Sequence, residues 1–163
     1  MEYNYIDLEL PSGTLWCDRN LGASESRSLG NYYAWKESYQ KDNYTLQNYY
    51  LTNGSDTAQF VLSGGWRMPT YDDVQELIKF CQIIDKGEFY IFKRRKYGAE
   101  LIIPKAGMID GLFLDTSKEP LFWTSTPFDS DKAYYCVSRR ILCDPVLPKY
   151  VGLNIRPVCS KQV

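Results

Sequence analysis

Residues 71–84 carry the clearest periodic pattern of apolar positions in the chain. Their apolar stripe has the i, i+3, i+4, i+7 spacing of an amphipathic helix and consists of Val74, Leu77, Ile78 and Cys81. Thr70 stands in the N-cap position, and Asp73 follows three residues later, as in a capping box. Gly87 supplies a stop signal. We therefore predict a helix over 71–84, and a shorter one over 56–62.

From residue 88 onward the apolar period changes to two, which is typical of strands. The runs are EFYIFKR (88–94), AELIIP (99–104), LFWTST (121–126), AYYCVSRR (133–140) and GLNIRPV (152–158). Near the amino terminus, 5–17 alternates as a half-buried strand interrupted by PSGT, and 30–38 favours a strand. Residues 39–56 are polar and Tyr/Asn-rich, which predicts a long surface loop. The order predicts a single α+β domain over 1–163, with a mostly antiparallel sheet and one or two helices.

Composition excludes several functional classes. The 163 residues carry 19 basic and 20 acidic side chains and no histidine, which removes the usual general base and the commonest metal ligand. The KRRK run at 93–96 lies beside aromatic residues, but the balanced charge favours a solvated strand end or hairpin tip over a nucleic-acid surface. Fourteen tyrosines, seven phenylalanines and four tryptophans are the main outlier, and such rings are common at recognition surfaces.

The five cysteines form no CxxC pair, so neither a zinc knuckle nor a thioredoxin-like motif is predicted. They are Cys17, Cys81, Cys136, Cys143 and Cys159. Cys81 falls on the apolar stripe of the helix, where it acts as a small core residue. A bridge across a hairpin between Cys136 and Cys143 is compatible with their spacing, but spacing does not establish connectivity.

The stretch GGWRMPT, residues 64–70, is interpreted as scaffold. A phosphate-binding loop places its glycines directly at the helix start, whereas Met68 and Pro69 intervene here, and no lysine follows. A nucleophile elbow needs a nucleophile in the turn, and none precedes Thr70. We expect Trp66 to anchor in the core and Arg67 to bond carbonyls or a carboxylate.

Five separated stretches together resemble the family called the major paralogous domain, in the family's order over residues 5–159. They are YIDLELPSGTLW with NLGAS, GNYYAWKE, GGWRMPTYDDVQELI, IIPKAGMIDG and FWTSTPFDSDKAYY with GLNIRPVC. The fold of that family resembles the C-type-lectin-like fold, in the variety that formylglycine-generating enzymes share. The resemblance implies an α+β domain whose carboxy-terminal strands and loops display a binding surface. It also assigns Trp66, Trp123 and Arg156 to the fold, with Trp35 in the core.

The chain departs from the family in two places. WCDRNLG puts Arg19 nearer the position of a family cysteine and displaces Cys17, which leaves a bond from Cys17 to Cys159 open. Family members are mostly secreted or lipid-anchored, whereas MEYNYIDLEL has no basic segment followed by an apolar one, so no secretory signal is predicted. No apolar run approaches the ~20 residues of a membrane-spanning helix. We expect an extracellular or cell-surface protein, or a bacteriophage virion protein released by lysis.

The candidate ligand-binding residues lie in the carboxy-terminal third of the chain. They are Phe128, Asp129, Asp131, Tyr134, Arg139, Arg140, Lys149 and Tyr150. Calcium-dependent sugar binding in lectin-like folds uses carboxylate–Pro–Asn motifs, which EPL at 119–121 and DPV at 144–146 do not complete. Calcium also needs six to eight oxygen ligands, and the chain has no dense carboxylate loop. We therefore expect no metal and no cofactor.

Three functions remain open at this point. The favoured one is a non-enzymatic module that binds a glycan or a surface protein, with no nucleic acid, no membrane insertion and an oligomer as one option. The second is a structural, assembly or receptor-binding protein of a bacteriophage virion. The third is an enzyme with a copper centre at Cys136 and Cys143, whose spacing and flanks do not match those of the formylglycine-generating enzymes.

Overall fold

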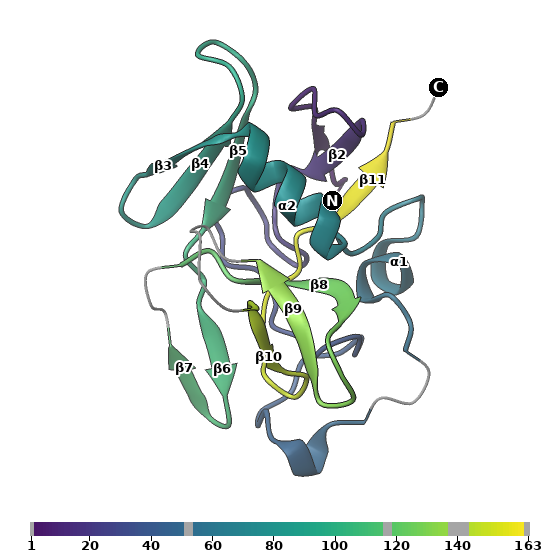
Figure 1. The fold of residues 1–163 in the computed structure, drawn as a ribbon. Coiled ribbons are helices and arrows are strands. Elements are labelled where there is room, and N and C mark those ends of the chain that lie inside the picture. Colours follow the sequence, from purple (N-terminus) through teal and green to yellow (C-terminus); the bar gives the residue numbers. More distant parts are fainter. Residues whose placement is uncertain (1, 51–53, 116–118, 137–143, 162–163) are drawn as a thin grey trace.

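The first and last strands of the chain belong to one sheet (Figure 1). The computed structural model describes residues 2–50, 54–115, 119–136 and 144–161. Strands β1 (Tyr5–Ile6), β2 (Thr14–Cys17) and β11 (Val158–Ser160) pair antiparallel in the order β1-β2-β11. All four residues of β2 are buried, so this strand runs through the interior and is not half-buried as the sequence pattern suggested.

Three further sheets within the described residues are also antiparallel. Their strands are β3 (Gln82–Asp85), β4 (Phe89–Lys93) and β5 (Glu100–Pro104); β6 (Met108–Asp110) and β7 (Phe113–Asp115); and β8 (Phe122–Pro127), β9 (Lys132–Cys136) and β10 (Val146–Pro148). The helices are α1 (Thr57–Leu62), α2 (Tyr71–Phe80) and the 3-10 turn η1 (Leu46–Asn48). An α+β protein with mostly antiparallel sheets and two α-helices is therefore confirmed.

Helix α2 begins where the sequence predicts and ends earlier. The Thr70 side chain accepts the Asp73 N–H at 3.1 Å, and Asp73 Oδ2 accepts the Thr70 N–H at 2.8 Å, so the capping box is confirmed. The helix ends at Phe80 because the next residues, Gln82–Asp85, pair with β4 instead of continuing the turn. A strand pairing thus overrides the helical periodicity of the final predicted turn.

Two predicted strands are wrong in extent. In the segment 30–38, Tyr33 makes a single bridge to Leu153, and the rest is irregular although much of it is buried. In 152–158, isolated bridges precede the start of β11 at Val158. Both segments are rich in β-formers, but they run through the centre of the protein, where backbone groups bond several different partners in place of one ladder.

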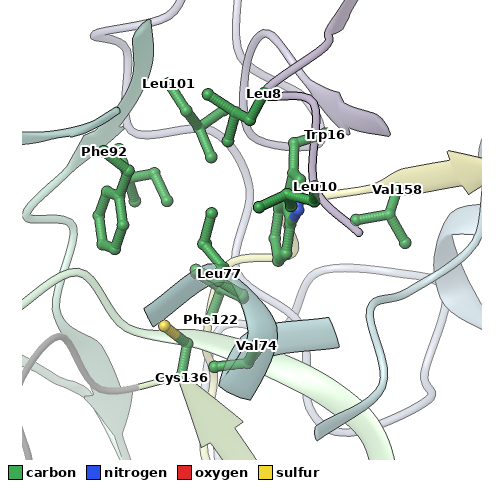
Figure 2. Packing of buried hydrophobic residues seen from close by; sticks show 11 residues of the cluster. Leu8, Leu10, Trp16, Val74, Leu77, Phe92, Leu101, Phe122, Cys136 and Val158 are labelled. Atoms are coloured by element: carbon green, nitrogen blue, oxygen red, sulfur yellow. The ribbon is translucent and has the colours of Figure 1, made fainter. Parts of the chain in front are cut away.

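Helix α2 covers one of the main cores. Figure 2 shows Val74 and Leu77 of the helix in one buried cluster with Trp16, Phe92, Phe122 of β8 and Cys136 of β9. A second core gathers around Trp123, with Trp35, Met68 and Leu153. The β8–β9 hairpin supplies residues to both cores, so its base is fixed while its tip extends toward solvent.

Not all of the residues that were expected to build the scaffold are buried in the core. Trp123 and Arg156 are fully buried, and Trp35 is in the core as predicted. Arg67 donates to the Met68 carbonyl at 3.1 Å and to Asp73 Oδ2 at 2.7 Å, as expected for its position. Trp66 is only half-buried and lies outside the core clusters, so its predicted role as a core anchor is wrong.

Arg156 is a buried cation bound by polar groups of the first third of the chain. Its Nε donates to Asn20 Oδ1 at 2.8 Å, and its Nη1 donates to the Cys17 carbonyl at 3.1 Å. Burial lowers the pKa of Arg156 to about 10, which still leaves the guanidinium charged at neutral pH. The side chain therefore holds the segment around 17–20 against the carboxy-terminal strand region.

Replacing Asp73 with asparagine tests the helix start and its pH dependence. Burial raises the pKa of the Asp73 carboxyl, but hydrogen bonding to Arg67 and Thr70 outweighs burial. The pKa of Asp73 therefore lies below its unfolded value. The carboxylate therefore stabilises the fold above about pH 4. That contribution is lost as pH falls through the lower, folded pKa. We expect Asp73→Asn to lose about 1–2 kcal/mol of unfolding free energy at pH 7, with the difference shrinking in acid.

Urea unfolding of both proteins between pH 7 and pH 3 measures this difference. Asp72→Asn is the matched control, because Asp72 lies in the same helical turn and is exposed. A wild-type advantage that stays constant down to pH 3 would contradict the assignment to Asp73.

Candidate functional site

The tip of the β8–β9 hairpin is an exposed turn with a defined backbone conformation. Asp129 Oδ1 accepts the N–H groups of Asp131 and Lys132, each at 2.8 Å, and these bonds lower the pKa of Asp129. The N–H groups of Phe128 and Asp129 bond the Lys132 carbonyl. Asp129 therefore shapes the turn, while the side chains of Phe128 and Asp131 remain exposed.

Three rings from two elements form a cluster beside this turn. Tyr134 of β9 stacks on Tyr71, the first residue of α2, with ring centroids 4.3 Å apart and planes at 27°. Phe128 meets the Tyr134 ring edge-on at 5.6 Å and 85°. We call Tyr71, Phe128 and Tyr134 the aromatic cluster. Phe128 is 45% exposed and the two tyrosines are half-buried, so the cluster reaches the surface.

The position of Tyr71 is set by the helix start. Its N–H donates to Thr126 Oγ1 at 3.0 Å, which ties the first turn of α2 to the end of β8. The Ser125 N–H also donates to the Pro69 carbonyl at 2.8 Å. These bonds fix the backbone at the start of α2 against the hairpin, where the Tyr71 ring stacks on Tyr134. Two rotatable side-chain bonds per ring then leave little entropy to lose on binding.

The cluster has a polar edge. The Tyr134 hydroxyl donates to Asp144 Oδ1 at 3.3 Å. Burial, followed by the negative charge of Asp144, raises the pKa of Tyr134 and of Tyr71. Both phenols therefore keep their protons at neutral pH and present hydroxyl groups that donate and accept hydrogen bonds. Rings with a carboxylate and hydroxyl groups at their edge suit a ligand with both apolar and hydroxyl-bearing faces.

Lys149 and Tyr150 lie beneath the hairpin. Lys149 is buried, with its Nζ donating to the Ser130 carbonyl at 3.1 Å and lying 4.6 Å from the centre of the Trp35 ring. Its backbone N–H donates to the Asp131 carbonyl at 2.8 Å. Tyr150 is half-buried and packs against the second core. Lys149 thus supports the turn from inside the protein, and its ammonium does not extend from the surface.

The predicted site residues therefore divide into groups. Phe128 and Tyr134 are in contact, and the exposed Asp131 lies on the adjoining turn. Asp129, Lys149 and Tyr150 hold or underlie that turn. Arg139 and Arg140 lie outside the described residues. Sequence reasoning did not assign Tyr71 or Asp144 to the site, because only the tertiary contacts of α2 and β10 bring them to Tyr134.

The described residues include free thiols at Cys17, Cys81, Cys136 and Cys159. Cys136 is a fully buried free thiol, and burial raises its pKa, so it is not a thiolate at neutral pH. Cys143, its partner in the hypothetical copper centre, lies outside the described residues. Over the described ranges, Cys, Asp and Glu side chains do not gather in threes that suit a metal ion. The absence of a metal from the whole chain stays a prediction.

No family model, curated protein or solved structure matches this chain. The family resemblance of the five sequence stretches accordingly remains a hypothesis. Among the described residues, no helix combines the length and apolarity needed to cross a membrane.

Proposed function

We propose that this protein is a non-enzymatic binding module that recognises a glycan through the aromatic cluster on the β8–β9 hairpin. The observation that carries the proposal is the arrangement around Tyr134, with Tyr71 stacked at 4.3 Å, Phe128 edge-on at 5.6 Å and Asp144 on the hydroxyl. A sugar ring has an apolar C–H face and a rim of hydroxyl groups. The rings suit the face, and the carboxylates and phenols suit the rim.

Rigidity supports the same proposal. The backbone that carries the rings is held by the hydrogen bond from the Tyr71 N–H to Thr126 and by the turn that Asp129 closes. A surface whose side chains are already ordered loses less entropy when a ligand binds. Exposed Asp131 and Lys132 on the neighbouring turn supply adaptable polar contacts, as in other aromatic-rich recognition surfaces.

A binding role agrees with the absence of histidine from the sequence. The chain has no histidine, and the buried Cys136 thiol is held protonated. The proposed fold is the C-type-lectin-like variety of the major paralogous domain. It is supported by the five sequence stretches and agrees with antiparallel sheets and two helices. Because members of that family are mostly secreted or lipid-anchored, an extracellular or cell-surface location is part of the same proposal.

Replacing Tyr134 with alanine tests the site. A glycan array probed with the wild-type protein identifies a bound sugar, whose affinity is then measured by titration calorimetry. We expect Tyr134→Ala to weaken binding by a factor of about 30 or more, as for a central aromatic residue of an interface. Binding is expected to survive a chelator, because the proposed contacts are made by side chains.

Tyr5→Ala is the matched control for this experiment. Tyr5 is 60% exposed on β1 and is not one of the rings that contact Tyr134, so its loss is expected to leave glycan affinity unchanged. Circular dichroism shows whether each variant is folded. Absence of any glycan ligand, or equal affinities of the Tyr134→Ala and wild-type proteins, would contradict the proposal.

A further inference from the structure

The tip of the β6–β7 hairpin exposes three consecutive large apolar side chains. Leu112 is 79% exposed, Phe113 71% and Leu114 42%. We call residues 112–114 the apolar tip. In Figure 1 this two-stranded ribbon extends from the body at the lower left. Contiguous apolar groups at such a prominent position mark a site of association with another surface.

Strand β6 and the turn that follows it are hydrogen-bonded to the body. Ile109 and Gly152 exchange two backbone hydrogen bonds of 2.9 Å each. Gly111 and Tyr44 exchange another pair, at 2.8 and 2.9 Å, and Tyr44 itself is buried. The apolar tip is therefore presented in a fixed direction.

The opposite end of the molecule carries a complementary surface. The β4–β5 hairpin ends in Arg94, Arg95, Lys96 and Tyr97, and the Tyr97 ring is 91% exposed. We call residues 94–97 the basic tip. In Figure 1 the β4–β5 turn lies at the top of the view, whereas the apolar tip lies at the bottom.

A shallow, open depression adjoins the basic tip, with room for about one water molecule. Its lining consists of Asp7, Leu8, Glu9, Arg94, Arg95, Gly98 and Ala99. The Arg94 guanidinium donates to the Glu9 carbonyl, and Arg95 pairs with the Glu9 carboxylate at 3.2 Å. These contacts hold the arginine stems against the amino-terminal segment, so the depression has a partly apolar wall.

We propose that the apolar tip of one copy of this chain docks on the basic tip of a second copy. Phe113 would pack over the depression against the aliphatic stems of Arg94 and Arg95, and Leu112 would pack on the Tyr97 ring. Asp110 and Asp115 flank the apolar tip, whereas Arg94 and Lys96 flank the receiving surface. Opposite charges around an apolar contact fix its orientation and favour this partner over an uncharged one.

This contact is heterologous, because it joins two different surfaces. An assembly of several copies always has a free apolar tip at one end and a free basic tip at the other. Further copies can therefore add to it, and an open chain grows unless the two ends meet in a ring. Added salt weakens the charged part of the contact, since exposed charges are screened over about 8 Å at physiological ionic strength. A self-assembling chain would suit the structural role in a virion that the sequence leaves open.

Two variants, each carrying one damaged surface, test the proposal. Phe113→Asp disables the apolar tip, and the double variant Lys96→Glu/Tyr97→Ala disables the basic tip. Light scattering with size-exclusion chromatography measures mass against protein concentration. The wild-type mass is expected to rise with concentration and to fall again with salt, while each variant alone stays monomeric. An equimolar mixture of the variants is expected to form a dimer with one copy of each, because each supplies the surface that the other lacks.

Phe60→Asp is the control, because Phe60 is 69% exposed on α1 and belongs to neither tip. It should associate like the wild type. A wild-type protein that stays monomeric at its highest soluble concentration would overturn the proposal. So would self-association of the basic-tip variant, since this would show that the apolar tip pairs with itself.

Discussion

Replacing Lys41 with methionine is expected to remove about 3–5 kcal/mol of unfolding free energy. Lys41 Nζ lies 2.5 Å from Glu37 Oε1, and the two side chains are only 7% and 2% exposed. Without the ammonium, the Glu37 carboxylate would be buried with no compensating charge. The cost of that unpaired charge exceeds the cost of the lost contact itself.

The surroundings of the pair show that it organises the loop that follows. The Lys41 ammonium also donates to the Asn48 carbonyl and lies within 6 Å of the Tyr39, Tyr49 and Tyr50 rings. Burial, and then the negative charge of Glu37, raises the pKa of Tyr39 and Tyr49. The ion pair thus holds the polar segment from residue 39 to residue 50 against the body.

Urea unfolding at pH 7 of a double-mutant cycle measures this effect. The partner variant Glu37→Gln should also destabilise the fold, whereas Glu37→Gln/Lys41→Met should recover most of the loss, because no buried charge remains unpaired. If the double variant were as unstable as the sum of the two single variants, the two side chains would not be coupled.

Replacing Trp123 with alanine is expected to cost about 3–5 kcal/mol of unfolding free energy. The indole is fully buried in the second core, and its Nε1 donates to the Tyr33 carbonyl at 2.9 Å. Because Trp123 lies in β8, the resulting cavity would also loosen the base of the hairpin that carries the aromatic cluster. Trp123→Phe keeps most of the ring and should lose less stability.

Trp66→Ala is the matched control for tryptophan removal. Trp66 is half-buried and outside the core clusters, so its loss should cost about 1 kcal/mol. Thermal unfolding followed by near-ultraviolet circular dichroism reports both changes. Equal costs for the two variants would contradict the distinction between a core and a peripheral tryptophan.

Sequence patterns were most informative where the physical cause is local. The capping box of Thr70 and Asp73 requires only four residues, and the observed helix begins where they place it. The KRRK run is part of a hairpin and its tip, as a cluster of exposed like charges between two strands predicts. The shorter helix predicted over 56–62 is also present, as α1 (Thr57–Leu62) with Asp56 as its N-cap.

The candidate site shows where local reasoning stops. The aromatic and polar character of 128–134 was visible in the sequence, and so was the buried character of Trp123. The contact of Tyr134 with Tyr71 was not, because 63 positions separate the two rings and no periodic pattern links them. Lys149 was predicted to contact a ligand at the surface because lysine is a charged residue, but the tertiary structure buries its side chain under the turn.

By itself, the sequence determined an α+β chain with a capped helix, antiparallel hairpins and a high overall content of aromatic residues. Only the tertiary structure decided which rings meet, which charges are buried and which apolar side chains stay exposed. The reason is physical: caps, turns and periodicity depend on neighbouring residues. Burial and ring contacts depend on chain segments that come together only after folding.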